Sequence, residues 1–361
     1  MLDELFAEAG RQLNICNSCR YCEGYCAVFP ALERRTLLDA GDLTQLANLC
    51  HDCRACFHAC MYAPPHEFAV DPPRILAAVR RASYDRYLPP AGWLRPGWSR
   101  GWPARVAAGA LVAVALLVVV GVTEGLGAVS RHGGPYQVIP YPALLVVVLV
   151  PTVWCVAVLF RGFAMYWREV HGPLRGLADW RALGTALAAA VRLRNMRGGG
   201  EECYYSGDDP SPARRRLHGA VAGGFTACFA ATVSAAFLQD VLGRPPPYPV
   251  LSVPVILGTA GGLSMLAGCA GLIALRRRGA PAEQGVADYG LLFGLGLLAL
   301  TGLLTLLLRA TPAFGLILVI HLATIVVCFV IAPYTRFVHA GYRYLALVAD
   351  AIEQRRPGSM V

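Results

Sequence analysis

Residues 16–26 read CNSCRYCEGYC, and residues 50–60 read CHDCRACFHAC. Each run has the spacing C-x2-C-x2-C-x3-C, which is typical of bacterial iron–sulfur proteins. In that pattern three closely spaced thiolates bind one [4Fe–4S] cluster, and the fourth thiolate binds the other cluster. The spacing therefore predicts two clusters. The ligands of the first are Cys16, Cys19, Cys22 and Cys60, and those of the second are Cys50, Cys53, Cys56 and Cys26.

The two runs leave some alternatives open. Ferredoxin runs usually have Pro directly after the fourth Cys, but Ala27 and Met61 stand there in this chain, which leaves the pairing of the fourth ligands open. A zinc site would use four ligands, usually as two C-x2-C pairs, and would leave the third and fourth thiols of each run idle. A disulfide framework would need an oxidising compartment, which nothing at the N-terminus indicates. Two identical runs favour two [4Fe–4S] clusters over both.

The rest of the chain is strongly apolar. Of its 361 residues, 56% are hydrophobic, and the mean hydropathy is +0.49. These values exclude an ordinary soluble domain and indicate several membrane spans of ~20 apolar residues each. Six stretches have this length and character: 104–123, 142–161, 217–242, 250–275, 288–308 and 312–333.

The basic residues predict the orientation of these spans. All 32 are Arg, and only Arg131, Arg244 and Arg309 fall in the three outer connections. The other 29 lie on the N-terminal side or at the inner ends of spans, so the positive-inside rule places both termini in the cytoplasm. The start has no basic n-region and no apolar h-region, which agrees with this orientation. We therefore expect a multi-pass protein of the bacterial inner membrane, in contact with lipid, whose Arg excess does not indicate nucleic-acid binding.

The expected fold class is all-α. An α-helical, ferredoxin-like domain with two clusters covers residues 1–95, and a six-helix transmembrane bundle covers 96–349 with an inner loop at 162–216. Residues 350–361 form a cytoplasmic tail.

Three helices are expected outside the spans. Apolar residues at helical spacing predict a helix over 33–49 and a second one that starts after Pro72–Pro73 and covers 74–88. A basic helix over 172–198 is expected to lie on the inner leaflet.

Five further Cys are not used by the clusters. Cys203 lies in a polar loop and has no assigned role. The other four lie in apolar stretches and are expected to be packing residues: Cys155, Cys228, Cys269 and Cys328.

Three His are candidates for haem binding, since ionisable side chains in membrane helices are costly and indicate function. His218 opens the third span, His321 lies inside the last, and His339 follows the last span where the helix is expected to continue. Eighteen residues then separate His321 from His339, which is five turns of about 3.6 residues on one face. His218 and His339 lie at matching depth near the inner boundary, which predicts one haem b between them. His321 lacks such a partner and is a further candidate ligand. The alternative for each His is a polar group bonded to backbone or water.

The strings CRYCEGYCAVFPALE, CMYAPPHEFAVDPPR, RRRLHG and FVHAGYRY resemble the tricarballylate/citrate-utilisation protein B family, and the resemblance covers most of the chain. It implies a membrane electron carrier with two iron–sulfur clusters and b-type haem that reoxidises a separate FAD-dependent dehydrogenase acting on tricarballylate. The His–His doublet of the family is His218–Gly219 here, which argues for one haem. The pair His321 and His339 is also similar to that of the dihaem cytochrome b subunit of respiratory nitrate reductases.

We therefore expect electrons to pass from a flavoprotein to the clusters, then to haem b, and then to the quinone pool. No nucleophile–base constellation is present, which indicates an electron-transfer subunit rather than a stand-alone enzyme. One alternative is a membrane redox sensor, although nothing resembles a signalling output domain. Another is a transporter of citrate-like acids, which would need Arg or broken-helix N-termini at the midplane of the membrane.

Overall fold

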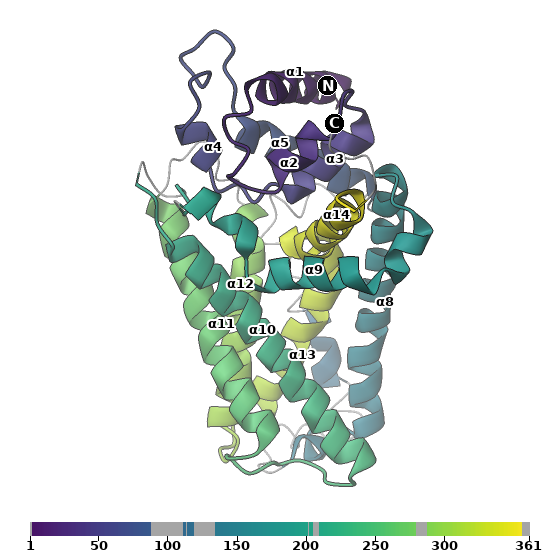
Figure 1. Cartoon of the computed structure of the whole chain (residues 1–361). Coiled ribbons are helices and arrows are strands. Elements are labelled where there is room, and N and C mark those ends of the chain that lie inside the picture. The colour runs from purple at the N-terminus through teal and green to yellow at the C-terminus, as the bar shows by residue number, and fades with distance from the viewer. Residues whose placement is uncertain are drawn as a thin grey trace. The chain divides into compact units, whose positions relative to one another are not determined.

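The computed structural model describes residues 2–87, 111–112, 114–118, 134–200, 202–204, 209–278 and 287–355. All regular elements in these ranges are helices (Figure 1). The one β-type pairing that they contain is an isolated bridge between Cys203 and Ser211. The expected all-helical fold is therefore confirmed.

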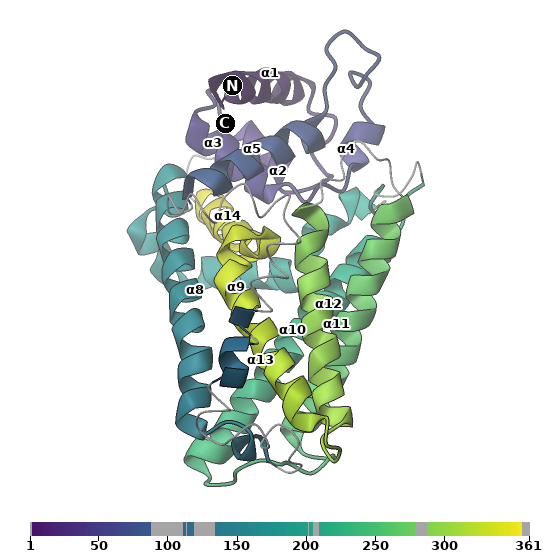
Figure 2. The same ribbon diagram turned by 180° about the vertical axis from the view of Figure 1, so that it is seen from behind.

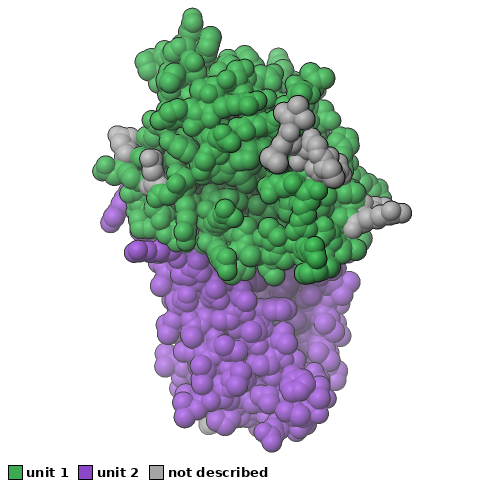
Figure 3. Space-filling view, viewed as in Figure 1, with its two compact units in different colours: residues 1–90, 158–215, 338–361 green, residues 91–157, 216–337 purple. Residues whose placement is uncertain are grey.

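The chain divides into two compact units (Figure 3). Unit 1 consists of residues 1–90, 158–215 and 338–361, and unit 2 consists of residues 91–157 and 216–337. This differs from a division at residue 95, because the inner loop and the C-terminal segment pack with the Cys-rich region. The helices of unit 1 are α1 (Leu2–Cys19), α2 (Val28–Glu33), α3 (Ala40–Leu49), α4 (Ala55–His58), α5 (Pro72–Tyr87), α9 (Trp180–Val191), α14 (His339–Glu353) and the end of α8 (Tyr141–Glu169).

The core of unit 1 explains why distant segments belong to it. Tyr342 of α14 is 3% exposed, and its ring contacts the rings of Tyr84, Tyr87, Phe163 and Tyr166 at centroid distances between 4.6 and 5.5 Å. These residues come from all three segments of the unit. Aromatic side chains bury large apolar areas, so this cluster holds the segments together.

Ion pairs join the first and third of these segments at the other end of α14. Arg35 Nη2 lies 2.9 Å from Glu353 Oε1, and Arg35 Nε lies 2.6 Å from Asp42 Oδ1. Arg34 forms an ion pair with Asp350, which is also buried. Since buried charges are costly without partners, these contacts fix the register of α14 against α2 and α3.

Two of the expected helices need corrected bounds. The helix expected over 33–49 begins at Ala40, because Asp39 accepts a hydrogen bond from the Asp42 amide and forms a capping box with it. The helix expected over 172–198 is confined to α9, which begins after Asp179 caps its first turn. The α5 helix covers Pro72–Tyr87 and so begins two residues before the expected start.

Unit 2 contains long apolar helices. They are the first part of α8, α10 (Ala213–Ala236, extended as a π-helix over Phe237–Val241), α11 (Val253–Arg278), α12 (Ala287–Leu307) and α13 (Phe314–Ile331). Five helices of the described chain are long and apolar enough to cross a membrane, by length and composition. They coincide with five of the six expected spans, and most of the stretch 104–123 lies outside the described residues. The chain therefore has the character of a membrane protein.

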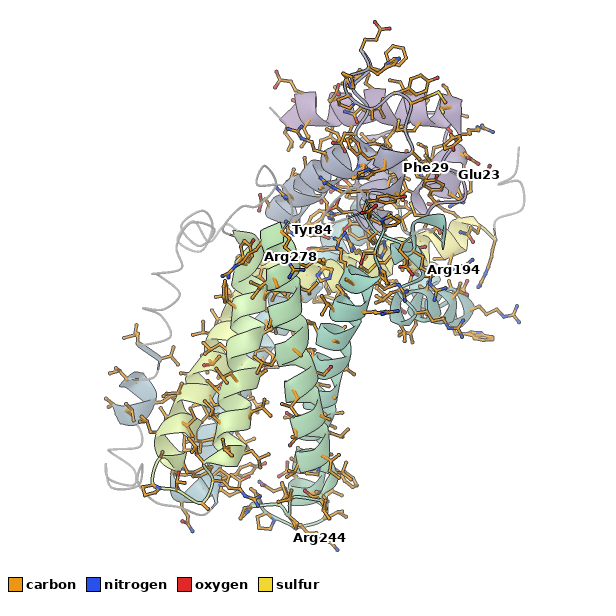
Figure 4. The ribbon with its side chains drawn as sticks, turned by 90° about the vertical axis from the view of Figure 1, so that its left-hand side faces the viewer. Glu23, Phe29, Tyr84, Arg194, Arg244 and Arg278 are labelled. Atoms are coloured by element: carbon orange, nitrogen blue, oxygen red, sulfur yellow. The ribbon has the colours of Figure 1, made fainter. Side chains whose placement is uncertain are left out.

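Small residues allow the helices of unit 2 to pack closely. A Cβ atom on Gly224 of α10 would lie 2.6 Å from the carbonyl oxygen of Gly261 in α11, so both positions require the absence of a side chain. The α11 and α12 helices run side by side (Figure 2). Figure 4 places Arg244 and Arg278 at opposite ends of this unit.

The last span does not continue to His339. The α13 helix ends at Ile331 and is followed by two short 3₁₀ helices, Ala332–Tyr334 and Arg336–Val338, with Thr335 extended between them. Pro333 has no amide N–H to continue the α-helical pattern. His339 therefore begins the separate helix α14. The expected five-turn register between His321 and His339 is wrong, and the similarity to dihaem cytochrome b subunits loses its basis.

Candidate functional site

Four thiols from two distant parts of the sequence line one cavity in unit 1. We call Cys16, Cys19, Cys22 and Cys60 the first thiol group. The other residues that line the cavity are Ile15, Tyr21, Phe29, Ala59, Met61, Tyr62 and Val70, so none of its lining side chains is charged. Phe29 is labelled in Figure 4. Cys16 and Cys19 lie at the end of α1, and Cys60 follows α4.

Burial and neighbouring thiols raise the pKa values of two Cys in this group. Burial raises the pKa of the Cys16 thiol to about 12, and the neighbouring Cys60, Cys22 and Cys19 thiols add to the shift. Burial and the same kind of neighbours raise the pKa of Cys22 to about 11. A buried site crowded with thiols disfavours negative charge unless a positive centre compensates it. Iron supplies such a centre in iron–sulfur proteins.

The remaining four thiols form the second thiol group, which consists of Cys26, Cys50, Cys53 and Cys56. Burial raises the pKa of Cys56 well above its usual value, and the Cys26, Cys50 and Cys53 thiols, followed by Cys22, add to the shift. Burial also raises the pKa of Cys26, and the Cys50, Cys53 and Cys22 thiols add to the shift. Cys50 caps the end of α3, and Cys53 precedes α4. The fourth Cys of each run therefore lies with the first three of the other run.

Left-handed residues make the tight turns around these thiols. Arg20 follows Cys19 with φ 55°, and Asp52 and Arg54 flank Cys53 with φ 54° and 66°. Such conformations cost of order 1 kcal/mol or more for residues other than Gly, and they concentrate at functional sites. In the described ranges, no three His, Cys, Asp or Glu side chains are arranged to hold a single metal ion.

Guanidinium groups surround the backbone of the second thiol group. Arg343 Nη2 donates to the Cys50 carbonyl oxygen at 2.9 Å, and Arg80 Nη1 donates to the same oxygen at 2.8 Å. Arg80 also donates to the carbonyl of Ala47 at 2.7 Å, and Arg214 donates to that of Asp52. Burial, followed by the charge of Arg80, lowers the pKa of Arg343 to about 9, so its guanidinium is charged at neutral pH.

A Gly-rich loop covers the second thiol group. Gly198 has φ +51°, and a Cβ atom there would lie 2.8 Å from Ala55 Cβ and 3.9 Å from Cys53 Sγ. The Tyr204 amide donates to the Cys53 carbonyl at 2.9 Å. Cys203 is buried and donates to the Met196 carbonyl at 3.2 Å.

Sequence reasoning missed this loop because it lies more than 130 residues from the Cys runs. The GGG triplet at 198–200 was the available signal, since Gly permits close approach and positive φ.

The candidate haem ligands are divided between the units. His321 lies in α13 of unit 2, and its Nδ1 is 2.9 Å from Thr301 Oγ1 of α12. This contact orients the imidazole within unit 2. A metal-bound His and a structural His would both need such a partner. His218 lies in α10 of unit 2, and His339 begins α14 of unit 1. Their assignment as a haem pair stays a prediction.

Comparisons with known proteins identify the family of this chain. The model of the family described as citrate utilization protein B matches residues 104–360, and the model of its Fer4-like domain matches residues 9–86. The chain belongs to the citrate utilization protein B family.

All eight Cys of the two thiol groups lie within the part that matches the Fer4-like domain. The chain is 38% identical to citrate utilization protein B of Escherichia coli over 363 residues, which covers 99% of this chain and 94% of the relative. No solved structure matches.

Proposed function

We propose that this protein is a membrane-bound electron-transfer subunit whose two thiol groups each hold one [4Fe–4S] cluster. The observation that carries the proposal is that unit 1 gathers eight thiols into two groups of four, although each group draws on both Cys runs. When bound, the clusters accept and release single electrons. The protein supplies position, burial and charge.

The surroundings of both groups fit such clusters. The first thiol group lines a cavity instead of converging on one point. Near the second thiol group, Arg343 Nε is buried and has no hydrogen-bond acceptor among the described residues. A buried N–H without a partner is costly, and cluster sulfur atoms are common acceptors of hydrogen bonds. Both features therefore favour clusters over empty thiol sites.

The proposed path continues to one haem b with His218 and His339 as axial ligands, and then to a quinone. His321 is the further candidate ligand. Support for a membrane-embedded acceptor comes from the five apolar helices. A neutral imidazole is a good axial ligand, and two of them give a low-spin haem without covalent attachment.

The proposed electron donor is an FAD-dependent dehydrogenase that oxidises a tricarboxylic acid such as tricarballylate or citrate. The support is the family resemblance and the name of the Escherichia coli relative. Within this chain no residues are proposed to act on the organic acid itself. The protein is then an electron carrier for a partner enzyme in the bacterial inner membrane.

The proposed orientation places both termini in the cytoplasm. It rests on the distribution of Arg, and Arg244 and Arg278 lie at opposite ends of unit 2 as this distribution requires (Figure 4). A cytoplasm-active reporter fused after Val361 is expected to be active, and a periplasm-active reporter silent. The reverse pattern would contradict the orientation and would place the thiols in an oxidising compartment.

The central experiment measures iron, acid-labile sulfide and EPR signals after anaerobic purification of the full chain in detergent. We expect about eight irons per chain, four for each of two [4Fe–4S] clusters. Addition of a reduced flavoprotein dehydrogenase should then reduce both EPR-active centres. Two zinc atoms per chain without iron, or iron that no electron donor reduces, would refute the proposal.

A further inference from the structure

The two thiol groups differ in the charge around them. The cavity of the first thiol group is lined by thiols, aromatic rings and aliphatic side chains, none of them charged. Cys19 in this group is exposed, and the adjacent Tyr21 and Met61 are 61% and 65% exposed. Arg20 is the nearest cation in sequence, but it is exposed, so solvent screens its charge.

The second thiol group contains two buried and two half-buried Cys and lies beside cations. Cys50 and Cys53 are each 7% exposed. Arg80 and Arg343 both donate to the Cys50 carbonyl oxygen, at 2.8 and 2.9 Å. Within the described part of the chain neither guanidinium has a carboxylate partner within 4.0 Å, and the acidic groups that act on Arg343 are the Tyr84 hydroxyl and then the Cys50 thiol.

The Asp52 carboxylate opposes these two cations at Cys50. Asp52 is the carboxylate closest to Cys50 in sequence, and its Oδ2 lies 4.0 Å from Arg214 Nη2. Arg214 also donates to the Asp52 carbonyl. At Cys50 the charges of Arg80 and Arg343 therefore outnumber that of Asp52.

We propose that Arg80 and Arg343 make the cluster of the second thiol group the more oxidising of the two, so that electrons enter at the exposed first group and move to the second. This inference rests on the proposed function and adds the direction of transfer. Reduction adds one negative charge to a cluster, and a nearby fixed positive charge stabilises that added charge. One electron leaves the first cluster and one enters the second, with no change in bonds or protons.

The size of the effect follows from Coulomb's law. A unit charge about 10 Å away at an effective dielectric constant of about 20 changes a one-electron equilibrium by about tenfold or more. Each of the two guanidinium groups donates a hydrogen bond to the backbone carbonyl of Cys50, whose thiol belongs to the second group. Removal of either charge should therefore change the equilibrium constant for reduction of the second cluster by about tenfold. This corresponds to a midpoint potential that is lower by about 59 mV for one electron.

The test is an EPR-monitored redox titration of the purified full chain with both clusters bound. Arg343→Gln keeps a donor for the Cys50 carbonyl and removes the charge, whereas Arg343→Lys keeps the charge. Arg80→Gln is an independent second variant. Arg192→Gln removes an exposed charge from α9's C-terminal end in the same unit and is the matched control.

We expect the second midpoint to fall in Arg343→Gln and Arg80→Gln, and to stay near the wild-type value in Arg343→Lys and Arg192→Gln. The first midpoint is an internal control and should not move in any variant. The signals are assigned with Cys→Ala variants in each thiol group.

A second midpoint that does not respond to either Gln variant would overturn the inference, as would equal shifts of both midpoints. A wild-type protein in which the first thiol group has the higher midpoint would also overturn it. If Arg343→Gln loses the second cluster, Arg80→Gln decides the question. Protein without iron would instead refute the proposed function, so the two failures are distinguishable.

Discussion

Removal of Cys60 together with one other thiol tests how the two Cys runs share their ligands. Cys60 lies in the second run, but the structure places it beside Cys16 and Cys22. If each group of four holds one cluster, a variant that loses two thiols from one group loses one cluster. A variant that loses one thiol from each group loses both.

The magnitude follows from the grouping. Cys16→Ala combined with Cys60→Ala removes two ligands of the first thiol group, so about four of about eight irons should remain. Cys56→Ala combined with Cys60→Ala removes one ligand from each group, so almost no [4Fe–4S] iron should remain. Pairing within each run predicts the opposite result for both double variants. The two proteins carry the same number of substitutions and share Cys60→Ala, so each is the control for the other.

The assay is iron and acid-labile sulfide per chain after anaerobic purification, with EPR of the dithionite-reduced protein. The Cys16/Cys60 variant should keep a single EPR signal of unchanged shape. About four irons retained in the Cys56/Cys60 variant would refute the crossed grouping. It would also show that the segments around the cavity pack differently from the arrangement described above.

Three further predictions follow from single positions. Gly198→Val should disturb only the second cluster, because a side chain at φ +51° is strained and would meet Ala55. We expect the selective loss of one EPR signal, and the loss of both signals would contradict the prediction. Tyr342→Ala should destabilise unit 1 by about 3–5 kcal/mol, because four rings lose their contact with Tyr342. Thermal bleaching of the clusters measures this, and an unchanged unfolding temperature would count against this core. His218→Ala and His339→Ala should each remove the low-spin haem from dithionite-reduced spectra of membranes, whereas His321→Ala should keep it. Retained haem in the His339→Ala variant would refute that ligand pair.

Much of this protein is determined by short-range patterns in the sequence. Thiol spacing indicates the metal chemistry, since a C-x2-C-x2-C turn brings three thiols together with few other residues involved. Apolar runs of ~20 residues locate the spans, because their length must match the hydrocarbon layer. The helix over Pro72–Tyr87 follows from its starting prolines and its apolar spacing. Each of these features depends on residues that are close in the chain.

The expectations from sequence were wrong where a local feature ended or began a helix. The stretch after Ile331 remains apolar enough to look like a continuing helix. Pro333 and the extended Thr335 end it, so His339 starts a new helix in the other unit. The bounds of α3 were misjudged for a similar reason, since the capping box of Asp39 and Asp42 outweighs the apolar spacing before it.

Only the tertiary structure decided what surrounds the thiols. Arg343 is 293 residues from Cys50, yet its guanidinium bonds the Cys50 carbonyl. The loop at 198–204 reaches Cys53 from a segment that reads as polar and turn-rich. Such contacts depend on how three distant segments bury one aromatic core around Tyr342, and no spacing within any one segment encodes them. The sequence therefore determined which thiols are candidate metal ligands, and the fold determined the charge and burial around them.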